Sequence, residues 1–170
     1  MARKSVHTTG TTNKKDDLLS SLADELNKSN KSGVKLAYTL GETDDPSTVS
    51  EWISTGNTLL DLKISNRPNG GLPVGRIIEF TGLEGSGKSL LAAHIIAETQ
   101  KKGGKGIFID TENASSKEFW EAIGLNTDSN SFMYAPVESI EDVFTVVEKS
   151  ITSIREKDEN ILVTIVVDSI

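Results

Sequence analysis

The sequence predicts an α/β fold with a mainly parallel sheet and helices on both of its faces. Short apolar stretches rich in β-forming residues alternate with stretches that have helical periodicity. A glycine-rich loop also lies between a β-rich stretch and a helical one. Right-handed crossovers between such strands give a parallel sheet. The expected strands are residues 76–80, 106–110, 131–136 and 161–167, and the clearest helices are residues 90–101 and 138–155.

Composition excludes several classes of protein. The chain has 170 residues, a net charge of -7 and no cysteine, so one main domain is expected and neither disulfides nor thiolate metal sites can form. The negative charge argues against a protein that coats nucleic acid through bulk positive charge, but it does not exclude binding through a local patch. No apolar run approaches the length needed to span a membrane, so we expect no membrane partner and a cytoplasmic location.

The pattern divides the chain into three regions. Residues 1–15 are basic and contain no acidic residue, which predicts a disordered tail, with an arm that contacts phosphate as the alternative. Residues 16–50 contain an N-terminal helix and a linker. An apolar stripe on that helix packs on the chain's own core or contacts a neighbouring protomer; it consists of Leu18, Leu19, Leu22, Ala23 and Leu26. Residues 51–170 form the expected core.

Two local patterns predict how the core begins and continues. Residues 52–56 have the composition of a turn, which a short helix at residues 59–61 follows. Further along, Ser115 and Glu118 have the spacing of a capping box, and Gly124 is placed to end the helix that the box would start.

The most informative stretch is residues 82–89, which match the phosphate-loop pattern G-x-x-x-x-G-K-[ST] at every fixed position. Glycines keep such a loop open, and the helix N-terminus that follows favours an anion. Lys88 adds a positive charge for the β and γ phosphates, and the Ser89 hydroxyl is a suitable Mg²⁺ ligand. An accidental match by a glycine-rich turn is the alternative. The candidate nucleotide-binding residues are Gly82, Leu83, Glu84, Gly85, Ser86, Gly87, Lys88, Ser89 and Leu90.

Acidic residues at two strand ends extend this prediction. Asp168 closes an apolar strand, where a carboxylate can hold Mg²⁺ through water. Glu112 follows the strand at 106–110 and is the candidate general base that orients water for attack on the γ phosphate. Asp110 as the functional acid, or a merely solvated Glu112, is the alternative. Because the carboxyl ends of parallel strands share one edge, Lys88, Glu112 and Asp168 are expected to meet around one ATP with its Mg²⁺.

The chain resembles the RecA recombinases and the related phage UvsX proteins over residues 52–170. The likeness rests on motifs in the family's order: Ile53-Ser54-Thr55-Gly56, Leu60-Asp61, Gly70-Gly71-Leu72-Pro73-x-Gly75-Arg76-Ile77-x-Glu79, Gly82-x-Glu84-x-Ser86-Gly87-Lys88-Ser89, Phe108-Ile109-Asp110-x-Glu112 and Val166-Val167-Asp168-Ser169. It implies that residues 51–170 are part of a RecA-type ATPase core, with Glu112 and Lys88 as catalytic residues. It also implies that Phe119 stacks on adenine, although a plain core phenylalanine is the alternative.

The same resemblance implies an ATPase that forms filaments on single-stranded DNA and promotes homologous pairing and strand exchange in recombination and repair. Ser116 departs from the family, whose bacterial members carry an acidic residue there, and residues 1–50 match loosely. Because Ile170 follows Asp168 by two residues, we expect the N-terminal portion of a longer protein of a bacterial or phage-infected cell. The family's DNA-binding loops would come later. A phosphate-loop phosphotransferase, or a non-catalytic module that docks on recombinase filaments, is the alternative.

Overall fold

The computed structural model describes residues 18–30, 35–38, 47–113 and 115–169, which belong to two compact units divided between Val49 and Ser50. The predicted tail at residues 1–15 lies outside the described residues. The first unit contains helix α1 (Leu18–Ser29), in which no residue is buried. Its apolar stripe is exposed by 44 to 74%, at Leu18, Leu19, Leu22 and Leu26.

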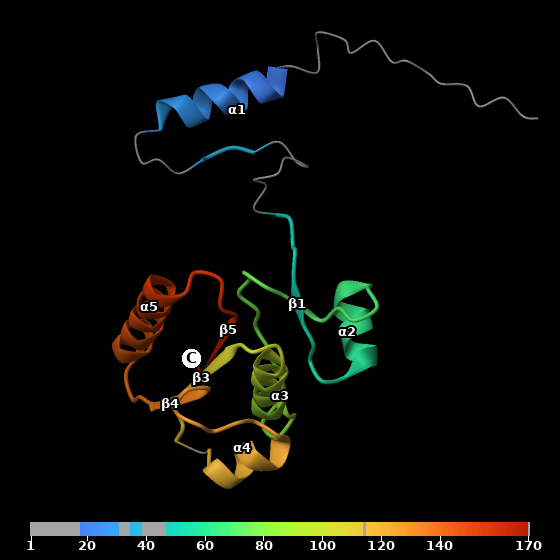
Figure 1. Ribbon diagram of the computed structural model, residues 1–170, viewed down its shortest axis with the longest axis vertical. Coiled ribbons are helices and arrows are strands. Elements are labelled where there is room, and N and C mark those ends of the chain that lie inside the picture. The colour runs from blue at the N-terminus through green and yellow to red at the C-terminus, as the bar shows by residue number, and fades with distance from the viewer. Residues whose placement is uncertain (1–17, 31–34, 39–46, 114, 170) are drawn as a thin grey trace, which may run out of the picture. The chain divides into compact units, whose positions relative to one another are not determined.

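The second unit contains a parallel three-stranded sheet in the order β4-β3-β5 and a short antiparallel pair, β1 with β2. Figure 1 shows the helices packed around these strands. The elements are β1 (Trp52–Ile53), α2 (Thr58–Ser65), β2 (Leu72–Pro73), α3 (Lys88–Lys101), β3 (Lys105–Asp110), α4 (Lys117–Ile123), β4 (Phe132–Pro136), α5 (Ile140–Lys157) and β5 (Val163–Asp168).

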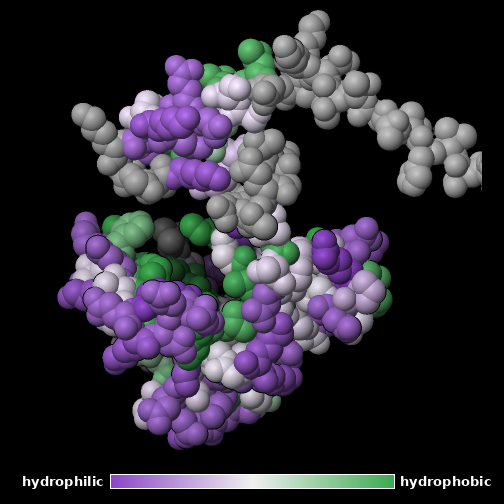
Figure 2. Space-filling view, turned by 45° about the horizontal axis from the view of Figure 1, so that its top comes forward, coloured by the Kyte–Doolittle hydropathy of each residue, from purple (hydrophilic) through white to green (hydrophobic). Residues whose placement is uncertain are grey.

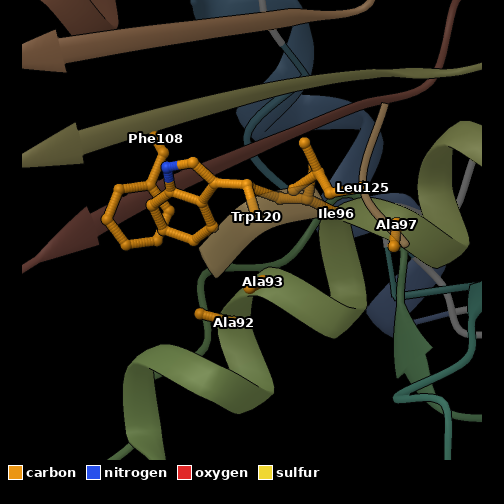
Figure 3. Packing of buried hydrophobic residues seen from close by; sticks show 7 residues of the cluster. All are labelled: Ala92, Ala93, Ile96, Ala97, Phe108, Trp120 and Leu125. Atoms are coloured by element: carbon orange, nitrogen blue, oxygen red, sulfur yellow. The ribbon is translucent and has the colours of Figure 1, made fainter. Parts of the chain in front are cut away.

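Helices cover both faces of the sheet, which confirms the predicted fold class. On one face α3 and α4 pack against β3 in the cluster of Ala92, Ala93, Ile96, Ala97, Phe108, Trp120 and Leu125, shown in Figure 3. The Phe108 and Trp120 rings lie 4.5 Å apart between centroids. On the other face Val143 of α5 packs with Ile107 and Ile109 of β3. Alternation of side chains along β3 therefore supplies both cores.

Close approach of α3 to the sheet depends on a glycine. A Cβ atom built on Gly106 of β3 would lie 2.1 Å from Cγ2 of Ile96 on α3, so any other residue would force the Ile96 side chain or the helix to shift. At the end of α3, the buried Thr99 hydroxyl lies 2.6 Å from the Thr164 hydroxyl of β5. The C-terminal half of the helix that follows the glycine-rich loop is thus held against β3 and β5.

Strand β5 is apolar, yet each of its residues is only partly buried. It pairs with β3, and within the described part of the chain no strand pairs with its other edge. Figure 2 shows hydrophobic surface in the middle of this unit with hydrophilic surface around it. No helix in the described ranges is long and apolar enough to cross a membrane.

The predicted strand at residues 76–80 is wrong. This stretch forms no ladder with the described strands, and Ile77 is fully exposed while Ile78 is 38% exposed. Phe80 alone of its residues packs, partly buried, on the cluster of Ile53, Leu72 and Ile95. Residues with β propensity form a strand only where a neighbouring strand supplies the backbone hydrogen bonds. Sequence composition does not predict which strand that is.

Two smaller predictions also need correction. The turn expected at residues 52–56 begins instead with β1, which pairs with β2. The helix cap expected at Ser115 falls one residue later: the Ser116 hydroxyl accepts the Phe119 N–H over 3.3 Å, and α4 starts at Lys117. The Ser115 N–H points elsewhere, to Asp110. Two adjacent serines could each cap the helix. Ser115 is bonded through its N–H to Asp110 of β3, and Ser116 is the N-cap.

Candidate nucleotide-binding site

The glycine-rich loop of residues 82–89 leads directly into α3. Gly85 and Gly87 have φ values of 68° and 90°, in the left-handed region that favours glycine. Gly87 is the N-cap of α3 and provides no side-chain cap, so the first turn of the helix presents backbone N–H groups without an intrahelical acceptor. This is the arrangement that binds phosphate at a helix N-terminus.

Lys88 lies over its own loop. Its ammonium group donates hydrogen bonds to the carbonyl oxygens of Gly82 (3.0 Å) and Leu83 (3.1 Å). These neutral acceptors face solvent, and phosphate oxygens are stronger acceptors for an ammonium group. The Lys88 side chain can therefore exchange loop carbonyls for a phosphate without leaving a buried charge unpaired.

A cavity of about 180 Å³ lies beside the loop, at the carboxyl ends of β3 and β5. It brings together the predicted Mg²⁺ ligands Ser89 and Asp168, the predicted base Glu112, and Phe119. Asp110 and Ser115 complete the lining. Residues up to 79 positions apart in sequence gather here because the parallel crossovers place these strand ends on one edge.

The other predicted nucleotide-binding residues do not line this cavity. They form the loop and the first turn of α3 next to it, with Leu83 exposed by 86% and Leu90 by 44%. A larger hollow of about 400 Å³ lies by the start of β3, where Gln100, Lys101 and Lys105 line it. None of the predicted site residues lies there, so we place the candidate site at the smaller cavity.

Glu112 is exposed, and its carboxylate accepts a hydrogen bond from the Ser169 hydroxyl at 3.0 Å. The loop that carries Glu112 is hydrogen-bonded to the end of β5. The Thr111 N–H donates to the Asp168 carbonyl (2.9 Å), and the Thr111 hydroxyl donates to the Ser169 carbonyl (2.8 Å). The candidate base is thus held next to the candidate metal ligand.

Asp110 is 2% exposed and its carboxylate accepts four hydrogen bonds. Burial opposes ionisation, but the bonds from Tyr134, Glu112, Ser115 and Asn113 outweigh it and hold the pKa of Asp110 below its ordinary value. Burial and the bond to Asp110 raise the pKa of Tyr134 to about 12. A carboxylate whose oxygens are already occupied is a poor general base, which favours Glu112 over Asp110 for that role.

Phe119 lies on α4, partly buried, with its ring centroid 4.9 Å from that of Trp120 in an edge-to-face arrangement. Phe119 packs against the core cluster and also lines the cavity. Both proposed uses of this residue, adenine stacking and core packing, are compatible with that position.

The described residues contain no group of three or more His, Asp or Glu side chains that would hold a metal on their own. Mg²⁺ in nucleotide sites commonly needs one or two protein oxygens, with water and phosphate oxygens as the remaining ligands. The Ser89 hydroxyl and the Asp168 carboxylate, which line one cavity, fit that requirement.

Two residues that received no role from the sequence make contacts at the site: Ser169 with the candidate base Glu112, and Tyr134 with the Asp110 carboxylate. Ser169 follows Asp168 in one of the motifs that resemble the RecA family. Its contact with Glu112 could be found only once the register of β3 with β5 was known. Tyr134 lies in a strand that was predicted from its apolar character. Its position two residues before the end of β4 was the available signal, because strand ends meet at the ligand-binding edge.

Comparisons with known proteins agree with this geometry. A glycine-rich loop that enters a helix at the carboxyl edge of a parallel sheet defines the phosphate-loop NTPase fold. Residues 20–170 match the RecA N-terminal domain, so the chain belongs to the RecA family.

Curated relatives support the assignment over shorter stretches. The chain is 41% identical over 103 residues to Protein RecA of Crocosphaera subtropica, which covers 61% of this chain and 28% of the relative. It is 51% identical over 77 residues to Protein RecA of Wolbachia sp. subsp. Brugia malayi (45% and 21%). It is 47% identical over 76 residues to DNA repair protein recA homolog 3, mitochondrial, of Arabidopsis thaliana (45% and 17%). The aligned stretches thus span less than a third of each relative.

Proposed function

We propose that this chain binds and hydrolyses ATP as part of a DNA-dependent recombinase. The observation that carries the proposal is the single cavity lined by Ser89 of the phosphate loop, Glu112 and Asp168. The family match supports the same function, because the matched region contains all three residues.

Each residue has a role in this proposal. The loop N–H groups and Lys88 bind the β and γ phosphates, and Ser89 with Asp168, the latter through water, holds Mg²⁺. Bound Mg²⁺ neutralises charge on the phosphates. Glu112 accepts a proton from the attacking water, and the Ser169 hydroxyl orients its carboxylate. Phe119 contacts the adenine base.

We further propose that the protein self-associates into filaments on single-stranded DNA and promotes homologous pairing and strand exchange in recombination and repair. Belonging to the RecA family supports this part of the proposal, as does the exposed leucine stripe of α1, which needs a partner surface. A cytoplasmic site of action in a bacterial or phage-infected cell follows from the same proposal.

The experiment uses the full-length protein and measures transfer of the γ phosphate of labelled ATP, with Mg²⁺, in the presence of single-stranded DNA or of small hydroxyl compounds. We expect release of inorganic phosphate at a rate that single-stranded DNA increases. Transfer of label to a small acceptor would favour a phosphotransferase instead, and the absence of any turnover under all of these conditions would contradict the proposed hydrolysis.

A further inference from the structure

The Asp110 carboxylate organises the loop that carries Glu112. Its Oδ1 atom accepts the N–H groups of Glu112 (2.9 Å) and Asn113 (2.8 Å), and its Oδ2 atom accepts the Ser115 N–H (3.3 Å). Three of the four donors are therefore backbone groups of one short loop. The fourth is the Tyr134 hydroxyl of the neighbouring strand β4, at 2.8 Å.

The loop requires such an acceptor because its backbone turns sharply. Asn113 has φ of 53°, a left-handed conformation that few residues other than glycine adopt and that asparagine tolerates. Successive N–H groups then point inward together, where they need a common acceptor. An ionised carboxylate makes stronger hydrogen bonds to such groups than a neutral oxygen does.

The Glu112 backbone is consequently fixed from two directions. On one side its own N–H is bound to Asp110, and on the other the preceding residue, Thr111, is bound through its N–H to the Asp168 carbonyl. What remains free to vary is the Glu112 side chain, which Ser169 contacts. A base must lie within hydrogen-bond reach of the water that it activates, so a displaced loop would cost turnover rather than nucleotide binding.

We infer that Asp110, itself held by Tyr134, is a positioning residue that sets the location of Glu112 for ATP hydrolysis. This inference rests on the proposed function, because it gives Glu112 a task to be positioned for. It assigns Asp110 no contact with the nucleotide. The Tyr134 hydroxyl donates to Oδ2, the oxygen that also accepts the Ser115 N–H, and so holds the carboxylate from β4 while the loop amides hold it from the loop.

The test uses two substitutions with different severity. Asp110→Asn replaces one carboxylate oxygen by an NH₂ group, which cannot accept the backbone N–H groups, and removes the charge from the other acceptor. Tyr134→Phe removes only the hydroxyl donor and keeps the ring that packs against the core cluster. Tyr38→Phe is the matched control, because it removes the same atom from the chain's other tyrosine.

Two readouts are needed for each variant. Amide hydrogen exchange, measured by NMR, should be on the order of tenfold faster at Glu112, Asn113 or Ser115 in Asp110→Asn, since loss of one hydrogen bond has about that effect. The turnover number for ATP should fall on the order of tenfold to a hundredfold in Asp110→Asn and about threefold in Tyr134→Phe, while the affinity for ATP with Mg²⁺ stays within about twofold. Tyr38→Phe should match the wild type in both.

The outcomes separate the inference from the proposed function. A wild-type chain that does not turn over ATP contradicts the proposed function and removes the inference with it. If the wild type is active, unchanged amide exchange in Asp110→Asn overturns the inference, and so does faster exchange without loss of turnover. A loss of turnover that weaker ATP binding fully accounts for also overturns it. If Asp110→Asn does not fold, Tyr134→Phe decides: wild-type turnover in that variant refutes the inference.

Discussion

The Ser169 hydroxyl donates a hydrogen bond of 3.0 Å to the Glu112 carboxylate, although 57 positions separate the two residues in sequence. The contact exists because β3 and β5 are parallel neighbours whose register pairs Asp110 with Asp168. The two loops that leave these strands therefore start side by side. A carboxylate that could act as a base and a carboxylate that could bind Mg²⁺ are brought to one edge by backbone pairing alone.

Replacing Glu112 by glutamine should abolish turnover and preserve nucleotide binding. Glutamine keeps the size of the side chain and can still accept a hydrogen bond from Ser169, but it cannot take a proton from water. We expect the hydrolysis rate to fall on the order of a hundredfold or more, with the affinity for ATP nearly unchanged. Phosphate release and equilibrium binding measure the two quantities separately.

Glu148→Gln is the matched control for that substitution, because Glu148 is an exposed glutamate of α5. Its turnover should equal that of the wild type. Unchanged hydrolysis in Glu112→Gln would assign the base to another residue.

Acid should destabilise the protein through Asp61. This residue is 5% exposed, and burial opposes its ionisation, but hydrogen bonds from Ser54 and Thr55 outweigh that effect and lower its pKa below the ordinary value of 3.8. A lowered pKa stabilises the fold above the unfolded-state pKa, and the contribution is lost as pH falls through the folded-state pKa. The free energy of unfolding should therefore decrease as pH falls below about 4.

Denaturant unfolding of Asp61→Asn across this pH range checks the assignment. At pH 7 the variant should be less stable by about 1 to 3 kcal/mol, because an amide cannot satisfy all three donors. Its stability should also change less than that of the wild type between about pH 4 and 2. A parallel loss in both proteins would mean that Asp61 does not contribute to acid sensitivity.

Two glycines that both have positive φ should respond differently to alanine. Gly71 and Gly75 have φ of +119° and +76°, but a Cβ on Gly71 would lie 2.2 Å from the Ile53 carbonyl oxygen, whereas a Cβ on Gly75 has no neighbour within 4 Å. Gly71→Ala should cost about 2 kcal/mol more than Gly75→Ala, because backbone atoms of β1 must move. Denaturation midpoints compare the two; equal midpoints would show that the β1–β2 contact is looser than described.

The exposed stripe of α1 should mediate self-association. Leu22→Glu places a charge among exposed leucines and should weaken association at least about tenfold, the value expected from one unburied leucine. Ser21→Glu adds the same charge on another side of the helix and should have little effect. Sedimentation velocity at several concentrations measures the difference. Equal association of the two variants would rule out the leucine stripe as the contact.

Elements defined by local periodicity could be predicted from the sequence. The helix expected at residues 138–155 is α5, Ile140–Lys157, and the strand expected at 131–136 is β4, Phe132–Pro136. The predictions failed where strand pairing determines whether a segment forms a strand. Residues 76–80 have the composition of a strand but belong to neither sheet of the described residues, and composition carries no information about strand pairing.

In the candidate site, too, local motifs could be predicted from the sequence and long-range contacts could not. The phosphate loop is a contiguous motif, so its residues could be named from the sequence, while the roles of Glu112, Asp168 and Phe119 stay predictions. Tyr134 could not have been assigned to Asp110, because the contact spans two strands and depends on their register. Long-range hydrogen bonds of this kind depend on the fold, and no local sequence pattern predicts them.

Binding of ATP with Mg²⁺ to the wild type and to Lys88→Ala, measured by calorimetry, tests the central claim most directly. The account predicts that the wild type binds and that Lys88→Ala binds at least on the order of tenfold more weakly, because the charge next to the phosphates is lost. Lys101→Ala, at the other end of α3, should bind as the wild type does. Equal affinity of Lys88→Ala and the wild type would contradict the assignment of residues 82–89 as a phosphate-binding loop.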